Sequence, residues 1–580
     1  MASLFAPISK GSLDVGFPSL KQYSLFVFLT VLSSTTALAV PKLRLSTTTL
    51  GPVSIAQGQN GKTQSLGAYN DGDGDLSLSF SSSVPWLTAQ PGSNIPCSNN
   101  PGKTCLGINV SLATSALPRG TVTGTLRVTD PNALDAPQDV IVTVQIGGGV
   151  PNSLSFYVAP NGSSAKQSIK TSNSFFASAT QPGGGVTLTL VSNGGGSFAT
   201  TFGYDVVVSA KPGTNEAMYS ALLNVTGSAI ATDNKPVPIN VQVTSLPIAL
   251  PSPASLYFKV ASSGTPQTSD VNFSNSGLTD LTVTGADPGG AAWLTAQVNG
   301  NTVTAAADPT GLANGIYTGN LTIASNAVNP LVVPVTLEVV DPGPPVSKFQ
   351  TVVSVAGSAP SSDAVALGDV VTIQGELFTA QSTQSADATQ PLPTTLGGAT
   401  VYVNDIATPI FSIASNKIQF QIPYEVSSGN ATVRVDRDGT TGNTLSLAIL
   451  PAAPRITSVQ NQNGVTVSTP GGSQATVAVG DTLTFWGYGF GPTNPGVASG
   501  TPAPDGSALD PSLVVRFSSG GLFGLNITVS PLQANLVTGS IGLYQVVVPV
   551  PANTPHGSTI PVTVELPGVA SSKAVYLNIP

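Results

Sequence analysis

The chain has few charged residues for its length. Charged side chains make up 8% of its 580 residues, against roughly 25% in an ordinary soluble protein. Helices need Glu, Lys and Arg on their exposed faces, so this composition disfavours a helical fold. The 20 Lys and Arg are spread along a chain with a net charge of −8. The sequence therefore lacks the basic clusters that binding to nucleic acid or to a charged membrane surface requires.

Histidine is almost absent, and this removes most familiar catalytic sets. The single histidine, His556, lies in a Pro-His-Gly sequence typical of a turn. The chain also contains no G-x-S-x-G elbow, no H-E-x-x-H motif and no Walker-type loop. We therefore expect no catalytic residues and no enzyme. An extracellular hydrolase that uses an unrecognised pair of carboxylates is the remaining catalytic alternative.

Cysteine is nearly as scarce. Cys97 and Cys105 are the only two, and the segment between them contains Asn-Pro-Gly, which favours a loop. A metal site would need more ligands, and the histidine is far away in sequence. We predict a structural disulfide, with free thiols as the alternative. A disulfide in turn indicates an oxidising compartment.

Only the N-terminus has a long apolar run. Lys10 and Lys21 precede the run Tyr23–Leu32, and an Ala-x-Ala cleavage sequence follows at Ala37–Ala39. The run is shorter than the about 20 residues that cross a bilayer. We expect residues 1–39 to be a signal peptide. The mature protein is then secreted or at the cell surface and has no integral membrane span.

Internal repetition is the main feature that the chain does have. Trp86-Leu-Thr-Ala-Gln90 recurs as Trp293-Leu-Thr-Ala-Gln297, 207 positions later, in a chain with three Trp. A weaker copy without the Trp lies between them. Short alternating runs rich in Val, Thr and Ile, separated by turn residues, predict β-sandwiches. The predicted modules are 42–148 (with the cysteines in an insertion), 152–246 and 252–341.

The repeated tryptophans have two interpretations. Trp86 and Trp293 could stack on sugar rings as ligand platforms, or each could fill a sandwich core, which we favour. Strand alternation would place Trp and Thr on one face and Leu on the other. The middle copy must fill the same space differently, and its candidates are Phe175, Phe176 and Phe198.

Three alternating aspartates suggest calcium, because hard oxygen ligands at alternate positions begin an EF-hand loop. These are Asp71, Asp73 and Asp75, but the later Glu of such a loop is missing. The third module has Ser276 and Leu278 in place of two of the acids. We therefore interpret the shared Asn-x-Gly-x-x-Asp as a hairpin turn in which Asn and Gly tolerate positive φ. The aspartates remain weak calcium candidates, and no cofactor is expected.

The N-terminal repeats resemble a known family. Trp-Leu-Thr, then Gly-x-Tyr-Thr-Gly-x-Leu-Thr-Ile, then Val-Pro-Val-Thr-Leu-x-Val is similar to the BACON module, an Ig-like sandwich of secreted bacterial proteins. The copy at 252–341 carries the pattern best, and the copy at 152–246 is degenerate. The resemblance implies an extracellular protein and a carbohydrate-binding role.

A second duplication follows a Pro-rich linker at 342–349. Gly368-Asp-x5-Gly-x2-Phe378 recurs as Gly480-Asp-x5-Gly-x2-Phe490, in units at 350–451 and 454–580. This start is similar to IPT/TIG-type Ig-like domains. The pair resembles a C-terminal domain shared by uncharacterised secreted proteins of Solibacter-type acidobacteria. Trp486, in the second unit, is expected in the core.

These observations predict an all-β chain of tandem Ig-like β-sandwich modules in an elongated array. The expected role is structural, adhesive or binding, without catalysis, and the partner is an unknown extracellular glycan or protein. A dedicated extracellular carbohydrate-binding protein is the first alternative, and the hydrolase is the second.

Overall fold

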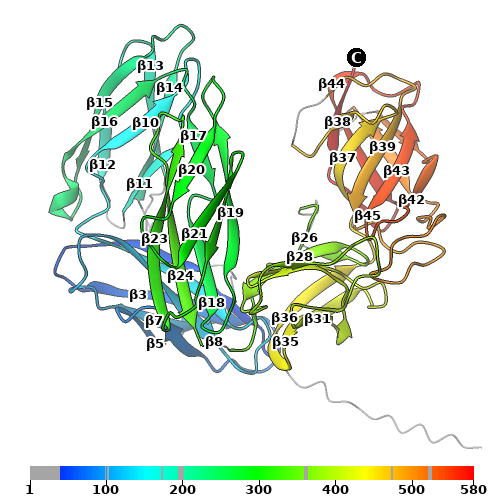
Figure 1. The fold of residues 1–580 in the computed structure, drawn as a ribbon, viewed down its shortest axis with the longest axis horizontal. Coiled ribbons are helices and arrows are strands. Elements are labelled where there is room, and N and C mark those ends of the chain that lie inside the picture. Colours follow the sequence, from blue (N-terminus) through cyan, green and yellow to red (C-terminus); the bar gives the residue numbers. More distant parts are fainter. Residues whose placement is uncertain are drawn as a thin grey trace, which may run out of the picture. The chain divides into compact units, whose positions relative to one another are not determined.

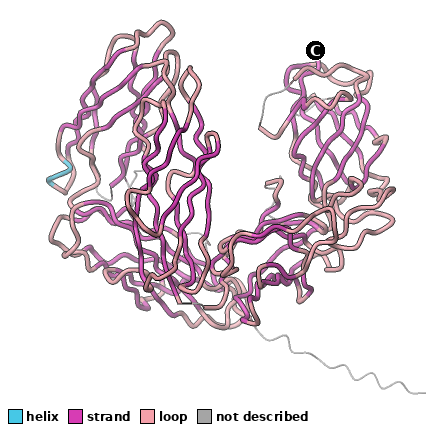
Figure 2. The backbone as a smooth tube through the Cα atoms, viewed as in Figure 1, coloured by secondary structure: helices cyan, strands magenta, loops and turns pink. Residues whose placement is uncertain are grey.

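The regular secondary structure of the described residues consists almost entirely of β-strands, which loops and turns connect (Figures 1 and 2). The computed structural model describes residues 40–580 except 98–99, 101–103, 172–173, 194–201, 342, 358–363, 472–474 and 520–524. The predicted signal peptide lies outside the described residues. In the described chain, helical structure is limited to the 3-10 turn η1 (Ala231–Asp233), and no helix there is long and apolar enough to cross a membrane.

The described strands form two sheets in each of five successive β-sandwiches, here called modules 1 to 5. Each module has its own hydrophobic core, and among the described residues no core cluster crosses from one module to the next. The all-β, tandem Ig-like fold expected from the composition, the repeats and the alternating runs is confirmed.

Module 1 pairs its strands in the orders β1-β3-β7-β5, with β6 beside β7, and β2-β9-β8-β4. The strands β2 and β9 run parallel, and the other pairs are antiparallel. The bounds are β1 Leu43–Leu45, β2 Thr49–Ile55, β3 Gly61–Asn70, β4 Ser79–Ser82, β5 Leu87–Pro91, β6 Ile95–Pro96, β7 Thr104–Leu112, β8 Gly120–Thr129 and β9 Gln138–Ile146.

Module 3 repeats this topology, and module 2 repeats it without a counterpart of β1. Their sheet orders are β10-β16-β15-β12 with β11-β14-β13, and β18-β24-β23-β20 with β17-β19-β22-β21. The parallel pair β2–β9 of module 1 has counterparts in β10–β16 of module 2 and β18–β24 of module 3. The bounds in module 2 are β10 Leu154–Val158, β11 Gln167–Thr171, β12 Phe176–Ala179, β13 Val186–Ser192, β14 Phe202–Ala210, β15 Ala217–Thr226 and β16 Pro236–Val243. Those in module 3 are β17 Ala249–Ser252, β18 Leu256–Ala261, β19 Gln267–Asn275, β20 Val283–Asp287, β21 Leu294–Asn299, β22 Thr302–Ala307, β23 Gly315–Ser325 and β24 Val332–Val340.

Module 4 has the orders β25-β28-β34-β33-β29, with β26 on β28, and β27-β36-β35-β31-β30, with β32 on β31. Its bounds are β25 Val346–Ser347, β26 Val353–Ser354, β27 Val365–Ala366, β28 Val370–Glu376, β29 Gln384–Ser385, β30 Thr395–Leu396, β31 Ala399–Val403, β32 Ile406–Ala407, β33 Ile410–Ala414, β34 Lys417–Gln421, β35 Gly429–Arg437 and β36 Thr440–Leu450. Since β25 pairs with β28, the predicted linker at 342–349 is partly wrong: its residues Val346–Ser347 form an edge strand of module 4.

Module 5 has the orders β38-β37-β39-β43-β42 and β41-β40-β44-β45, with β46 on β44. Its bounds are β37 Arg455–Asn461, β38 Thr466–Ser468, β39 Thr482–Tyr488, β40 Val514–Ser518, β41 Asn526–Val529, β42 Gln533–Leu536, β43 Tyr544–Pro549, β44 Gly557–Leu566, β45 Ala570–Ser571 and β46 Val575–Ile579. We expected Trp486 in the core, and this prediction is wrong. Strand alternation turns it to the outer face of β39, where its ring N–H donates to Gln460 Oε1 at 3.1 Å.

The Asn-x-Gly-x-x-Asp segments are not hairpin turns, which corrects the prediction. Each joins a strand of one sheet to a strand of the other, β3 to β4 and β19 to β20. Asn70 and Asn275 act through their side chains, whose Oδ1 accepts the backbone N–H two residues later at 2.8 Å in both copies. Gly72 is needed for close approach, because a Cβ there would lie 2.4 Å from the carbonyl oxygen of Val40.

Candidate functional site

The two repeated tryptophans are buried in equivalent places. Trp86 is 8% exposed and Trp293 is 9% exposed, and each belongs to its module's core. Each stands just before a strand, so Trp and the following Leu are both buried and Thr is exposed, contrary to the alternation we expected. Their buried rings leave little surface for stacking on a sugar.

A glycine lies beneath each ring. A Cβ on Gly124 would lie 3.1 Å from the Trp86 ring, and one on Gly319 would lie 3.3 Å from the Trp293 ring. The repeat therefore conserves a packing pair, a large ring over a residue without a side chain. In module 2, Gly185 stands where the other two modules have the tryptophan, just before the corresponding strand. Ala221 stands where they have the glycine beneath the ring.

Phe175 fills the core of the Trp-less module. It is 5% exposed and meets Tyr204 edge to face, with ring centroids 5.3 Å apart. Phe176, the second candidate, is 72% exposed. Phe198 lies outside the described residues.

The three aspartates of module 1 do not gather into a cation site. No group of three or more His, Cys, Asp or Glu that could hold a metal occurs among the described residues. Asp71 contacts the guanidinium of Arg44 at 3.6 Å, and the Asn70 side chain orders the loop by accepting and donating backbone hydrogen bonds. The arrangement supports a structural loop.

The two cysteines form the predicted disulfide, Cys97–Cys105. Both sulfurs are buried, and Cys105 lies in β7, next to the short insertion strand β6. The bond therefore ties the insertion of module 1 to its sheet. His556 lies elsewhere, exposed in module 5, and its Nδ1 contacts the carbonyl oxygen of Pro580.

A group of charged side chains connects three modules around Glu376. Strand alternation puts this residue on the outer face of β28, yet its side chain is only 7% exposed. It is covered because Arg127 of module 1 donates to it at 3.1 Å and Lys259 of module 3 contacts it at 2.9 Å. Lys348, at the start of module 4, adds a third cation at 3.5 Å.

Cross-strand partners brace two of these cations. Arg127 makes a two-pronged contact with Asp139 on the neighbouring strand, at 2.8 and 2.9 Å. Lysine 259 pairs with Glu338 on β24 at 3.5 Å. We call Arg127, Asp139, Lys259, Glu338, Lys348 and Glu376 the three-module cluster. Burial raises the pKa of Glu376, but the positive charges of its three partners outweigh burial and lower it to about 2.

Modules 1 and 4 also meet at a second point. Asp135, fully buried, accepts hydrogen bonds from the backbone N–H and the hydroxyl of Ser446 at 2.5 and 2.7 Å. Its own N–H donates to the Thr444 carbonyl oxygen at 3.0 Å. Since β27 pairs with β36 only at residues 449–450, this loop of module 1 covers part of a sheet edge of module 4.

Modules 4 and 5 are joined by a buried ion pair. Arg455, the first residue of β37, donates to Asp369 at 2.9 Å, and the two side chains are 3% and 0% exposed. Ser354 also donates to Asp369 at 2.8 Å. Here burial dominates over the charge of Arg455 and raises the pKa of Asp369 to about 6. Nearby, the hydroxyls of Tyr424 and Tyr544 hydrogen-bond across the junction at 2.8 Å.

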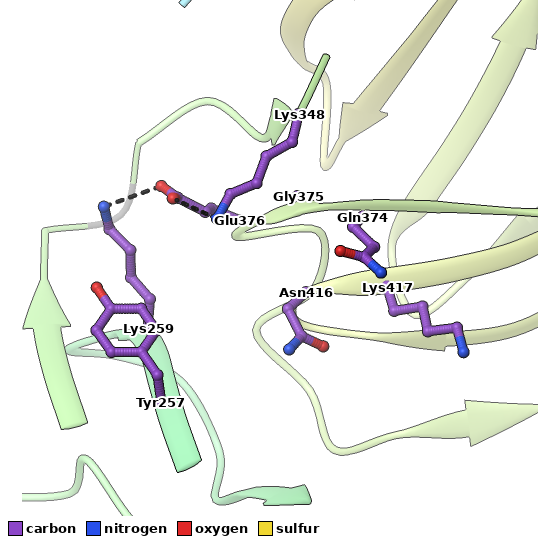
Figure 3. Close-up of a pocket in the computed structure, with 8 residues that line it drawn as sticks. All are labelled: Tyr257, Lys259, Lys348, Gln374, Gly375, Glu376, Asn416 and Lys417. Carbon is purple, nitrogen blue, oxygen red and sulfur yellow. Dashed lines mark ion pairs between the residues drawn. The ribbon is translucent and has the colours of Figure 1, made fainter. Parts of the chain in front are cut away.

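A cavity of about 230 Å³ opens beside the three-module cluster, between modules 3 and 4. In Figure 3, Tyr257 and Lys259 lie on one side of it and Gln374, Asn416 and Lys417 on the other. Glu376 and Lys348 lie between the two sides. The lining supplies ammonium, amide and phenol groups, which are hydrogen-bond donors.

Sequence reasoning did not identify this region. Its charged residues come from strands that are distant in sequence, and none of them stands at a position that the repeated motifs share. The only signal in the sequence is that Glu376 replaces the Tyr488 of the other copy at the end of the repeated strand. A charged residue that breaks an internal repeat can therefore mark a contact that only one copy makes.

Comparison with known proteins identifies one module. Residues 354–449 match the family model of the IPT/TIG domain, so this interpretation of module 4 is confirmed. No curated protein matches the chain. The BACON resemblance of modules 1 to 3, the IPT/TIG resemblance of module 5 and the Solibacter-type resemblance remain predictions.

The solved structures with some similarity include tandem immunoglobulin domains, cell-surface ectodomains and a glycoside hydrolase. Sidekick-1 immunoglobulin domains 1–5 match at 13% identity over 93% of this chain and 99% of that one, with a TM-score of 0.15. The human desmocollin-1 ectodomain matches at 10% identity over 70% and 79%, with a TM-score of 0.14. An endo-fucoidan hydrolase of glycoside hydrolase family 107 matches at 12% identity over 52% of this chain, with a TM-score of 0.18; the chain spans 45% of that protein. Similarity at this level concerns fold alone.

Proposed function

We propose that the chain is an extracellular, non-catalytic binding or adhesive protein whose modules hold their loops and sheet faces in a set arrangement. The proposal rests on one observation: side-chain and backbone bonds connect the modules to one another, and not only in chain order. In a chain with 8% charged residues, charged groups of three modules meet at Glu376.

The other junctions are bonded as well. The Gln145 amide of module 1 donates to the Lys170 carbonyl oxygen of module 2 at 2.8 Å, and the Thr232 hydroxyl of module 2 donates to the Gly147 carbonyl oxygen, just after β9 of module 1, at 2.6 Å. Between modules 2 and 3, the Leu278 N–H donates to the Ser245 carbonyl oxygen at 3.2 Å. Ordering the modules in advance lowers the entropy cost of binding a large partner.

Three further features support an extracellular role. The first 39 residues have the composition of a signal peptide. The Cys97–Cys105 disulfide is compatible with an oxidising compartment. The resemblance to BACON modules also fits a secreted protein. Carbohydrate binding through Trp86 and Trp293 is not part of the proposal, because both rings are buried.

The test combines scattering with a binding assay. We expect the exported chain to have a single radius of gyration by small-angle X-ray scattering, and Glu376→Gln to increase it by loosening a junction. In the second assay, the chain is incubated with a panel of extracellular polysaccharides and proteins, and both retention and release of reducing ends or peptides are measured. Retention without release supports the proposal. Turnover of any panel member would instead support the hydrolase alternative, and an unchanged radius in the variant would refute the set arrangement.

A further inference from the structure

One sheet of module 2 has an uncharged outer face. Its four strands, β10, β16, β15 and β12 (Figure 1), contain no Asp, Glu, Lys or Arg. Strand alternation turns Phe176, Met218 and Leu222 to the outer face, where they are 72%, 65% and 36% exposed. Pro236 and Pro238 of the neighbouring strand β16 are exposed beside them. No module in the described part of the chain therefore covers this apolar face.

The equivalent sheet faces of modules 1 and 3 are contact faces. Arg127 lies on the outer face of β8 and Lys259 on that of β18, and both meet Glu376 of module 4. The same face of the repeated sandwich is thus an interface between modules in the other two copies. Because an exposed apolar patch also marks an interaction site, we expect the face of module 2 to be an interface as well.

Module 2 has uncharged counterparts for both charged cross-strand pairs that brace Glu376. The strand registers, aligned on the glycine beneath each tryptophan ring and on Ala221, give two correspondences: Arg127–Asp139 of module 1 with Asn224–Pro236, and Lys259–Glu338 of module 3 with Tyr157–Gln242. A charged surface would lose solvent on this face and find no charged partner there. The face therefore suits an occupant that is itself flat, apolar and uncharged.

We propose that this face of module 2 docks against the same face of a second copy of the chain, in a dimer with twofold symmetry. Such a contact needs a patch that is complementary to itself, and an uncharged face meets no like-charge repulsion from its own copy. The rise and spacing of the four strands give roughly 500 Å² per copy, so a pair would bury about 1,000 Å², the lower limit for specific interfaces. The inference supplies a partner for the proposed adhesive role and rests on that role.

Sedimentation equilibrium of the whole exported chain tests the dimer. We expect a reversible monomer–dimer equilibrium with a dissociation constant in the micromolar range. Raising salt from about 50 to about 500 mM should not weaken it, since the face carries no charge. A chain that stays monomeric at about 200 µM, or a dimer that salt dissociates, would overturn the proposal. Oligomers larger than a dimer would also overturn it, because a contact between two different patches does not close at two copies in this way.

Variants taken from the repeats locate the contact. Leu222→Asn gives module 2 the residue that module 3 has at this position, Asn320, and Phe176→Ser gives it the Ser79 of module 1. Each should weaken dimerisation at least about tenfold, because a symmetric dimer loses the side chain twice. Leu532→Asn makes the same change at a 69% exposed position of module 5 and is the matched control, which should leave the dimer unchanged.

The outcomes separate this proposal from the broader function. Equal weakening in the control and in the face variants would mean general apolar association and refute the site. Module arrangement and retention on the panel are measured on dilute, monomeric samples. A chain that keeps its arrangement and retains a panel member, but does not dimerise, therefore refutes only this proposal.

Discussion

Two buried carboxylates at module junctions respond to burial in opposite ways. Glu376 is surrounded by three cations from different segments, and its pKa falls to about 2. Asp369 is fully buried with one cation, Arg455, and its pKa rises to about 6. The difference shows that one charge partner does not offset complete loss of solvent, whereas several partners and some remaining solvent do.

A third carboxylate completes the comparison. Asp481 occupies the place of Asp369 in the repeated Gly-Asp motif of module 5. It is not buried, and it accepts hydrogen bonds from the Ala478 N–H and the Gln462 amide, both at 2.8 Å. The same motif therefore carries a junction ion pair only where another module packs against it.

The largest effect is expected from breaking the fully buried pair. Arg455→Ala leaves Asp369 without its cation, and removing one partner of such a pair costs about 3–5 kcal/mol. Denaturant unfolding at pH 7.5 measures the loss. Arg516→Ala is the matched control, because its pair with Glu565 is on the surface with the arginine 40% exposed, and it should cost at most about 1 kcal/mol. Equal losses for both variants would contradict the role of burial.

Removing the charge of Glu376, which is less deeply buried than Asp369, should lower the unfolding free energy by a smaller amount. Glu376→Gln keeps the shape but loses charge-assisted bonds to Arg127 and Lys259, an expected loss of about 2 kcal/mol in unfolding free energy. Asp405→Asn serves as control, since Asp405 is 85% exposed beside Arg434 and should change stability by less than about 0.5 kcal/mol. If Glu376→Gln left the unfolding free energy unchanged, the three-module cluster would not stabilise the fold.

The pH dependence should have opposite signs at the two junctions. The folded pKa of Asp369 is raised, so the folded state holds the proton more tightly, and this junction gains about 1 kcal/mol as pH falls from 7.5 to 5. The folded pKa of Glu376 is lowered, so its contribution is complete above about 4.5 and is lost as pH falls toward about 2. Stability curves of Asp369→Asn and Glu376→Gln separate the two. Asp369→Asn should lack the gain, and an unchanged curve would contradict the assignment.

The smallest effect on stability is expected at Asp481, the counterpart of Asp369 in module 5. Asp481→Asn retains a side-chain oxygen that can accept a hydrogen bond from the Ala478 N–H, so we expect a loss of about 0.5 kcal/mol or less in the same unfolding assay. A loss as large as that of Arg455→Ala would place the stability in the motif itself and not in the junction.

The repeats and strand periodicity predicted the fold class, and the turn residues between the two cysteines predicted the disulfide. The core tryptophans were also correctly favoured, since burial of both rings follows from one repeated word. The sequence predicts less well which strands lie next to each other and which face of a strand a large side chain occupies. The Asn-x-Gly segments looked like hairpins because turn residues are alike in hairpins and in connections between sheets. Trp486 was placed on the wrong face because a large ring can also cover the outer side of a strand.

The candidate site was beyond sequence reasoning for a physical reason. Arg127, Lys259 and Glu376 lie in three modules, more than 100 residues apart, and no local pattern specifies which outer faces meet. Outer faces carry polar residues whether or not another module covers them. Only the contact between modules turns such residues into a cluster.

The most direct test of the account is whether module 1 touches module 4 at Glu376 in solution. Arg127→Lys places a reactive amine at this position, and a carbodiimide joins amines to carboxylates that are in direct contact. We predict a cross-link from position 127 to Glu376, together with two controls in the same digest: a link to Asp139 within module 1 and the native Lys259–Glu376 link. Mass spectrometry that finds both control links but no link from position 127 to Glu376 would contradict the account.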